Sequence, residues 1–214
     1  MSAQELLQQA EQEDGYRSWC KRDHLNTLAR SQTVYVPWHD QSDAIKYERL
    51  INNKARCVIM NPTADGGMPH TRGSNVICIP AHWSPSSIES TLRHEMIHIY
   101  QKRYPSLWKE KLLEEGWQAD VQIPRDTARR CRINPDTLQN RFCAWEGRYV
   151  PLPLFVREDR PSLREIQIRW YDLEEQRIHL DPPFSFIKRY GSLSDSAMEH
   201  PYELIAYHRE TSLN

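Results

Sequence analysis

Two histidines and a glutamate in the stretch TLRHEMIHIYQ, residues 91–101, have the types and spacing needed to bind a metal ion and activate water. On an α-helix, residues i and i+4 project from one face about one turn apart, so His94 and His98 can direct imidazole nitrogens at a single ion. Glu95 is rotated by roughly 100° from His94. Its carboxylate can therefore reach a water on that ion without binding the ion. H-E-x-x-H zinc sites use these three residue types in this way.

The surrounding residues decide whether this pattern is more than chance, because the chain contains nine histidines. A β-rich run, NVICIP (75–80), precedes the motif, and Ser84 and Pro85 supply a helix N-cap and a first-turn proline. The helix is expected to run to about Arg103 and to stop before Pro105. The motif is also flanked by apolar residues, namely Ile88, Leu92, Ile97 and Ile99. We therefore expect a buried helix rather than a solvated one.

The segment HEMIHIYQ after a short strand resembles the active-site helix of the zincin metallopeptidases. The similarity in sequence is specific from NVICIP to YQKR. Outside this segment only the expected arrangement of helices and strands is similar. It implies a bound Zn²⁺, hydrolysis of peptide bonds with Glu95 as general base, and an α+β, zincin-like fold. In that fold a small twisted mixed sheet packs on the H-E-x-x-H helix. The resemblance also makes NVICIP the candidate edge strand, on which an extended peptide substrate would add as a further strand.

A catalytic zinc needs a third protein ligand, and Glu203 in HPYELIAYH is our first candidate. Pro201 opens a C-terminal helix, and an unpaired glutamate among its apolar residues is costly unless it meets a cation. The segment also resembles the P-x-E-x-x-A helix that carries the glutamate ligand in several gluzincin-like zincins. We therefore expect His94, His98 and Glu203 to bind the metal.

Two other acidic residues compete for this role. Glu115 in LLEEGW resembles the glutamate of the aminopeptidase type of gluzincin, but its interval from His98 is short and its neighbours suggest a solvated helix that ends at Gly116. Asp120 is the weaker alternative. SprT-like proteases, which act on DNA-linked proteins, use a third histidine where this chain has Glu115, Gly116 and Trp117, so that branch is disfavoured.

A donor for the oxyanion that forms during hydrolysis is expected near the third ligand. Tyr207, one turn after Glu203, is the first choice, followed by Tyr202 and His208.

Two polar segments have open interpretations. The loop TADGGMPHTRGS, which contains His70 and Arg72, is either a surface turn or the rim of an active site. The run Asn134-Pro135-Asp136-Thr137 is most simply a turn with a helix cap, although Arg132 or Asp136 can instead line a cleft. Trp108, Trp117, Trp145 and Trp170 are expected in the core.

The chain is expected to form one metallopeptidase-like domain, residues 1–214. Residues 1–20 suggest a short helix or a loosely packed N-terminal arm, and residues 140–190 a β-rich insertion or subdomain, in which REIQIRW and RIHLD form a hairpin. Strands are also predicted at 33–38, 56–61 and 75–80. Helices are predicted at 42–52, 107–119 and 201–210.

Composition narrows the class of protein. The net charge of −1 gives no field that would attract nucleic acid or an anionic membrane. Five widely spaced cysteines without a C-x-x-C pair suggest reduced thiols, and neither a signal peptide nor a membrane-spanning run is evident. We expect a cytoplasmic protein with a peptide or protein substrate. A metal-stabilised binding protein without activity, or a zinc hydrolase of a non-peptide amide, would share the same residues.

Overall fold

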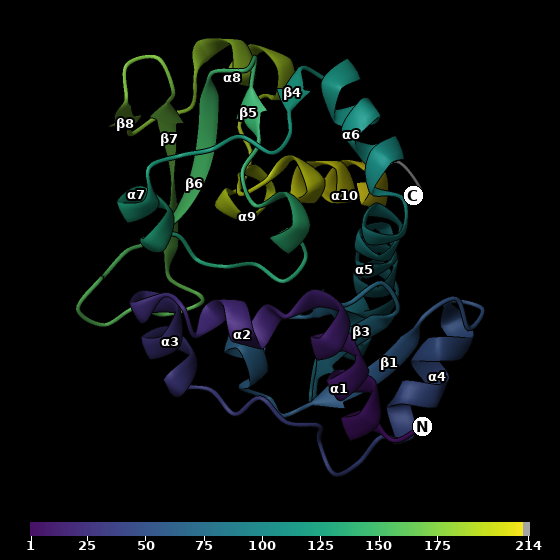
Figure 1. The fold of residues 1–214 in the computed structure, drawn as a ribbon. Helices are drawn as coiled ribbons and strands as arrows, with labels where there is room; N and C mark the ends of the chain where they lie inside the picture. Colours follow the sequence, from purple (N-terminus) through teal and green to yellow (C-terminus); the bar gives the residue numbers. More distant parts are fainter. Residues whose placement is uncertain (212–214) are drawn as a thin grey trace.

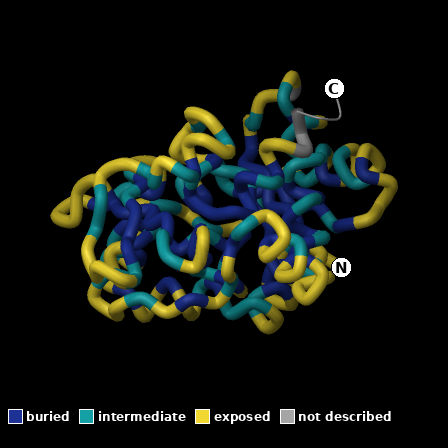
Figure 2. Tube along the Cα trace, turned by 90° about the horizontal axis from the view of Figure 1, so that it is seen from above, coloured by how far each residue is buried: buried dark blue, intermediate teal, exposed yellow. Residues whose placement is uncertain are grey.

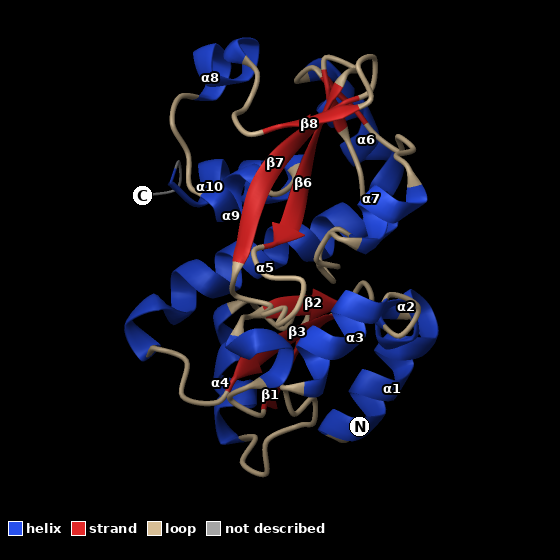
Figure 3. Cartoon of the chain, turned by 90° about the vertical axis from the view of Figure 1, so that its left-hand side faces the viewer, coloured by secondary structure: helices blue, strands red, loops and turns tan. Residues whose placement is uncertain are grey.

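Two small β-sheets and ten α-helices make up residues 1–211, the part of the chain that this computed structural model describes. The fold is therefore of the mixed α+β class. In Figures 1 and 3 the two sheets lie at opposite ends of the molecule, with α5 (Ile88–Arg103) and α10 (Pro201–Thr211) between them. The remaining helices are α1 (Ala3–Asp14), α2 (Tyr16–Cys20), α3 (His24–Ser31), α4 (Ser42–Leu50), α6 (Pro105–Glu114), α7 (Arg125–Arg129), α8 (Phe184–Tyr190) and α9 (Asp195–Met198).

The first sheet has the strand order β1-β3-β2. β1 (Arg56–Met60) runs parallel to β3 (Val76–Pro80), and β2 (His70–Arg72) pairs antiparallel with β3 on its other side. The expectation that NVICIP forms the edge strand is therefore wrong, because β3 is the central strand. The edge nearer the H-E-x-x-H helix is β2, which lies inside the segment that the sequence presented as a loop.

Alternating residues of β1 and β3 face two different layers, as the two-residue period of a strand requires. Ile59, Ile77 and Ile79 pack with Leu92 and Ile99 of α5. Residues of the opposite face pack against α1, and the buried members of that cluster are Leu6, Leu7, Ala10, Val58, Met60, Ala64, Val76 and Cys78. Both faces are covered, so the strands are apolar throughout, and α5 is held firmly against the sheet.

The N-terminal segment forms a helix, one of the two alternatives that its composition left open, and this helix is packed rather than loose. α1 begins at a capping box made by Ser2 and Glu5 and covers one face of the sheet with Leu6 and Leu7. Its last turn also supplies Asp14, which accepts hydrogen bonds from the fully buried guanidinium of Arg72. Such a buried ion pair requires the helix to stay in place.

Replacing Arg72 with leucine is expected to destabilise the fold by about 3–5 kcal/mol, because Asp14 and Glu11 would lose their cation inside the protein. Urea unfolding measures the difference. The matched control is Arg157→Leu, which breaks an exposed pair with Asp159 and should cost less than about 1 kcal/mol. Equal free energies of unfolding for the two variants would contradict the structural role of Arg72.

The second sheet has the order β4-β5-β6-β7-β8, and all of its neighbouring strands are antiparallel. Its strands are β4 (Trp117–Gln118), β5 (Ala144–Trp145), β6 (Tyr149–Phe155), β7 (Ile166–Asp172) and β8 (Arg177–His179). The predicted hairpin of REIQIRW and RIHLD corresponds to β7 and β8. The four tryptophans expected in the core are buried in one cluster with residues of α8 and α10.

One predicted strand is absent, and several helix boundaries differ from the sequence-based prediction. Residues 33–38 form no strand and contribute a single bridge, Pro37 to Met60, because Pro37 lacks the N–H that a ladder needs. The motif helix begins at Ile88 after a short 3₁₀ turn, Pro85–Ser87. Pro105 begins α6 rather than only ending α5, and α6 stops at Glu114, before the predicted end.

The buried segments gather in the interior of the molecule, and exposed loops surround them (Figure 2). Within residues 1–211, no helix is long and apolar enough to cross a membrane.

Candidate metal centre

The two motif histidines lie one turn apart on α5 and face the same point. The Nε2 atoms of His94 and His98 are 3.1 Å apart, and the side chain of His98 is completely buried while that of His94 is 12% exposed. α5 can place them there because Leu92 and Ile99, on its other face, pack on the three-stranded sheet. The i, i+4 spacing of the two histidines therefore brings their Nε2 atoms together at one point.

Glu203 completes the group from α10. Its Oε2 atom lies 3.2 Å from Nε2 of His94 and 3.3 Å from Nε2 of His98. α10 packs directly against α5, and Ala206, fully buried one turn after Glu203, leaves room for this close approach. The carboxylate thus reaches the histidine pair from a helix more than 100 positions away in the sequence.

These donor distances fit a tetrahedral divalent ion. Nitrogen or oxygen donors about 2.0–2.1 Å from a tetrahedral zinc are separated from one another by about 3.3 Å, close to the three separations found here, 3.1, 3.2 and 3.3 Å. Two imidazoles and one carboxylate are also a common donor set for catalytic zinc, which leaves a fourth position for water. The residues therefore fit the ion that the motif implies.

Gln101 fixes the orientation of His98. The amide Nε2 of Gln101 donates to the carbonyl oxygen of Tyr202, at 3.2 Å, so its Oε1 is the atom that faces His98. His98 Nδ1 then donates to Gln101 Oε1 across 2.7 Å. In the neutral imidazole this hydrogen bond leaves the Nε2 lone pair directed at the shared focus, which is how supporting residues usually prepare a histidine for a metal.

Asn134 fixes the orientation of Glu203. Its Nδ2 donates to Glu203 Oε1 at 2.9 Å, and its own Oδ1 accepts from the backbone N–H of Asp136 at 2.9 Å. One carboxylate oxygen is thereby held by the amide while the other, Oε2, faces the histidines. The sequence suggested only a turn at this position.

Asn134→Ala is expected to weaken metal binding by about 10–100-fold, the usual effect of removing a residue that orients a metal ligand. Competition with a chelating dye measures the affinity. Gln139→Ala is a suitable control, because Gln139 is an exposed residue of the same segment. A zinc affinity of the Asn134 variant within about threefold of wild type would show that Glu203 needs no such support.

The charges at this centre favour a cation. Burial lowers the pKa of His98, but the negative charges of Glu203 and Asp136 outweigh that effect and raise the pKa to about 10. Burial raises the pKa of Glu203, but the neighbouring His98 and the hydrogen bonds from the imidazoles lower it well below its usual range. The carboxylate therefore stays ionised. Because a metal ligand must be a neutral imidazole, binding of an ion here releases a proton.

Glu95 lies beside this group and takes no part in it. The residue is 4% exposed, lines the adjacent cavity, and its Oε2 is buried without a hydrogen-bond partner among the described residues. Burial, followed by the charge of Asp136, raises the pKa of Glu95 to about 8. A divalent ion at the adjacent centre would lower this pKa and favour the ionised carboxylate, which can accept a proton from a bound molecule.

A cavity of about 370 Å³ opens over the centre. Tyr207 lines it and packs its ring edge-on against His94, with centroids 4.7 Å apart. The other two candidates for an oxyanion donor are elsewhere. The hydroxyl of the buried Tyr202 bonds to the side chain of Asn140 at 2.6 Å, and His208 borders a different pocket, beside Tyr190.

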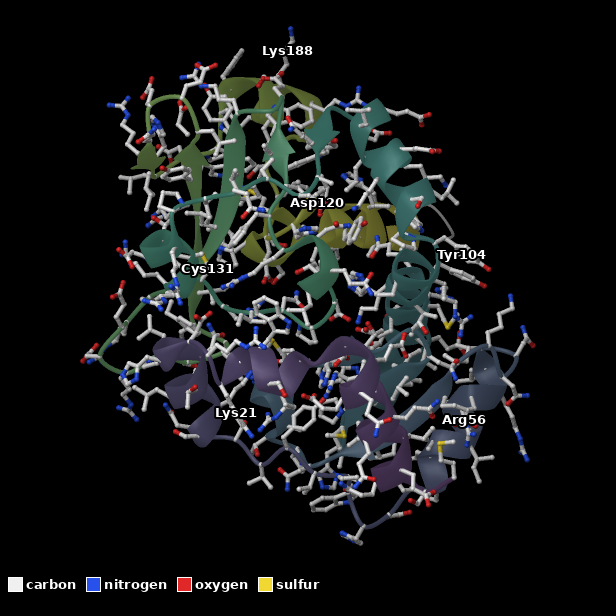
Figure 4. All side chains as sticks on the ribbon, in the orientation of Figure 1. Lys21, Arg56, Tyr104, Asp120, Cys131 and Lys188 are labelled. Atoms are coloured by element: carbon white, nitrogen blue, oxygen red, sulfur yellow. The ribbon has the colours of Figure 1, made fainter. Side chains whose placement is uncertain are left out.

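The competing ligands are not near the histidines. Glu115 is ion-paired with Arg189 at 2.6 Å, and both side chains are about half exposed. Asp120 follows β4 and pairs with Lys109 at 2.6 Å, and its position in Figure 4 is among the elements of the second sheet. Of the three acidic residues weighed in the sequence, Glu203 is the one that the structure brings to the pair.

The two polar segments with open interpretations both contribute to the cavity. His70 lines it and bonds to the hydroxyl of Tyr35, whereas Arg72 lies apart, in its ion pair with α1. Arg132 and Asp136 line it as well.

Asn134 and Gln101 were not predicted to act at the site. The position of Gln101, one turn after His98 on the same helix, was a weak indication that it could contact the imidazole. For Asn134 the sequence indicated only a turn.

A second group of potential ligands, Asp172, Glu175 and His179, lies in the β7–β8 hairpin. Arg148 already donates to both carboxylates there, at 2.6 and 3.2 Å, so this group carries its own counter-ion.

Comparison with known proteins gives no relatives: no family model, no curated protein and no solved structure matches this chain.

Proposed function

We propose that the protein is a zinc-dependent metallopeptidase, with His94, His98 and Glu203 as the metal ligands and Glu95 as the general base. The observation that carries this proposal is the convergence of the three donors at 3.1–3.3 Å from one another, beside the buried Glu95, whose Oε2 has no hydrogen-bond partner among the described residues. We also propose that the fold is zincin-like. In support, a mixed sheet packs on the motif helix and a glutamate-bearing helix packs on its other side.

When bound, zinc would supply a Lewis acid that polarises the scissile carbonyl and acidifies a water molecule. Glu95 accepts the proton of that water and later delivers it to the nitrogen of the leaving amine. Tyr207, at the cavity wall beside His94, donates a hydrogen bond to the oxyanion. Gln101 and Asn134 keep His98 and Glu203 in position throughout.

The direct test combines metal content with activity. Purified protein should contain about one equivalent of zinc by elemental analysis, and it should cleave members of a mixed peptide library identified by mass spectrometry. A chelator should remove both zinc and cleavage, and added zinc should restore them. Stoichiometric zinc with no cleavage of any peptide would favour a metal-stabilised binding protein instead.

A further inference from the structure

The β2 edge of the first sheet has no backbone groups available to pair with an added strand. Thr71 is the β2 residue whose backbone groups point away from β3. Its N–H donates to Asp136 Oδ1 at 2.7 Å, and its carbonyl accepts from Lys102 Nζ at 3.0 Å. The next outward position, Pro69, has no N–H. A peptide therefore cannot bind here as an extended strand, although this edge borders the cavity.

Five carboxylates line the cavity, and three of them have a guanidinium or imidazole partner within 3.4 Å. Asp65 lies 3.4 Å from Arg30, Glu199 is ion-paired with Arg132, and Glu203 faces the two imidazoles. Glu95 and Asp136 are the two that remain. Lys102 is 3.7 Å from Asp136 but is committed to the carbonyl and hydroxyl of Thr71.

Asp136 is fixed through one oxygen and has the other available. The residue is 6% exposed, and its Oδ1 accepts from both the N–H and the hydroxyl of Thr71. Among the described residues, no hydrogen bond reaches its Oδ2, although the side chain lines the cavity. A rigidly held carboxylate with one oxygen that receives no hydrogen bond is the acceptor that a bound cation would meet.

Asp136 also lies close to the reacting centre. It lines the same cavity as Glu95, and its backbone N–H donates at 2.9 Å to Oδ1 of Asn134, the residue that holds Glu203. A cationic group bound at Oδ2 would therefore lie near the scissile carbonyl. The α-ammonium of a peptide is two bonds from the first carbonyl carbon, whereas a lysine ammonium lies at the end of a four-carbon chain.

We propose that Asp136 binds a free ammonium group of the substrate, in the first place the N-terminal one, so that the enzyme removes residues from the amino end of peptides. This inference rests on the proposed metallopeptidase function and adds its substrate class. It replaces binding by strand addition, which the closed β2 edge prevents.

The test compares pairs of peptides that are identical except for a free or an acetylated N-terminus, with and without a lysine next to the scissile bond. For zinc-loaded wild type, kcat/KM should be about 10–100-fold higher for the free form, as expected for a charged hydrogen bond. A preference that follows the lysine and ignores acetylation would assign Oδ2 to a side-chain ammonium and overturn the N-terminal assignment. Equal cleavage of every peptide would overturn the inference while leaving the metallopeptidase proposal intact. No cleavage of any peptide would reject both.

Asp136→Asn isolates the recognition group. The amide oxygen can still accept from Thr71, while an NH₂ group replaces Oδ2, so zinc content should stay unchanged and the preference for a free N-terminus should disappear. Asp126→Asn is the matched control, because the side chain of Asp126 is 98% exposed. A preference retained in the Asp136 variant would refute its role. If that variant fails to fold, the wild-type comparison of free and acetylated peptides decides alone.

Discussion

Replacing Glu95 with glutamine will abolish turnover and leave zinc in the protein. The amide has the size of the carboxylate but cannot accept a proton, so kcat should fall by about 10²–10⁴-fold. Zinc should remain at one equivalent, because Glu95 is not among the three converging donors. Steady-state assays and elemental analysis on the same preparation measure both quantities.

The setting of Glu95 is the reason for expecting so large an effect. Its carboxylate is buried beside the three converging donors, and its Oε2 has no hydrogen-bond partner among the described residues. Burial and Asp136 raise its pKa to about 8, and a divalent ion at the adjacent centre would lower that value and favour the basic form. A carboxylate with a pKa near neutrality is suited to accepting and then releasing a proton.

Glu89→Gln is the matched control, since Glu89 lies on the same helix with a side chain 69% exposed. This variant should retain full activity. Peptide cleavage at an undiminished rate by the Glu95 variant would reject Glu95 as the base, and loss of zinc from it would indicate that Glu95 supports the metal instead.

The parts of the site that follow local rules were predictable from the sequence. The i, i+4 spacing places His94 and His98 on one face of any helix, and the apolar surroundings of Glu203 indicate a charge that needs a partner. The packing of α10 on α5 then brings them together. Here the local pattern and the tertiary structure require the same arrangement.

The cavity wall could not be predicted in the same way, because the segment 131–136 is held by distant residues. Asn26 and Arg30, on α3, donate hydrogen bonds to the carbonyls of Cys131 and Ile133, more than 100 positions along the chain. Figure 4 labels Cys131 at the start of this segment, after α7. Neither end of these contacts has a sequence pattern that indicates the other, so the roles of Asn134 and Asp136 emerge only in the folded chain.

The prediction that NVICIP forms the edge strand was wrong for a related reason. β2 has three residues, His-Thr-Arg, with no apolar alternation, and it follows a glycine-rich turn. Its burial is possible because Asp14 neutralises Arg72 and Asp136 satisfies Thr71. Without knowledge of those partners a polar tripeptide is read as a loop, and the apolar NVICIP is then assigned to the edge.

Two alanine variants distinguish Glu203 from Glu115 as the third metal ligand. Glu203→Ala is expected to lose zinc. With two imidazoles left, the affinity should fall by more than the about 10–100-fold expected for removing a supporting residue such as Asn134. Glu115→Ala should keep full zinc, because it breaks only an exposed ion pair with Arg189. The two variants remove the same side chain at two places in the fold, so the difference between their zinc contents reports the site and not a general effect of lost charge. Zinc retained by Glu203→Ala and lost from Glu115→Ala would assign the third ligand to Glu115, at the C-cap of α6, and contradict the distances of 3.2 and 3.3 Å on which the Glu203 assignment depends.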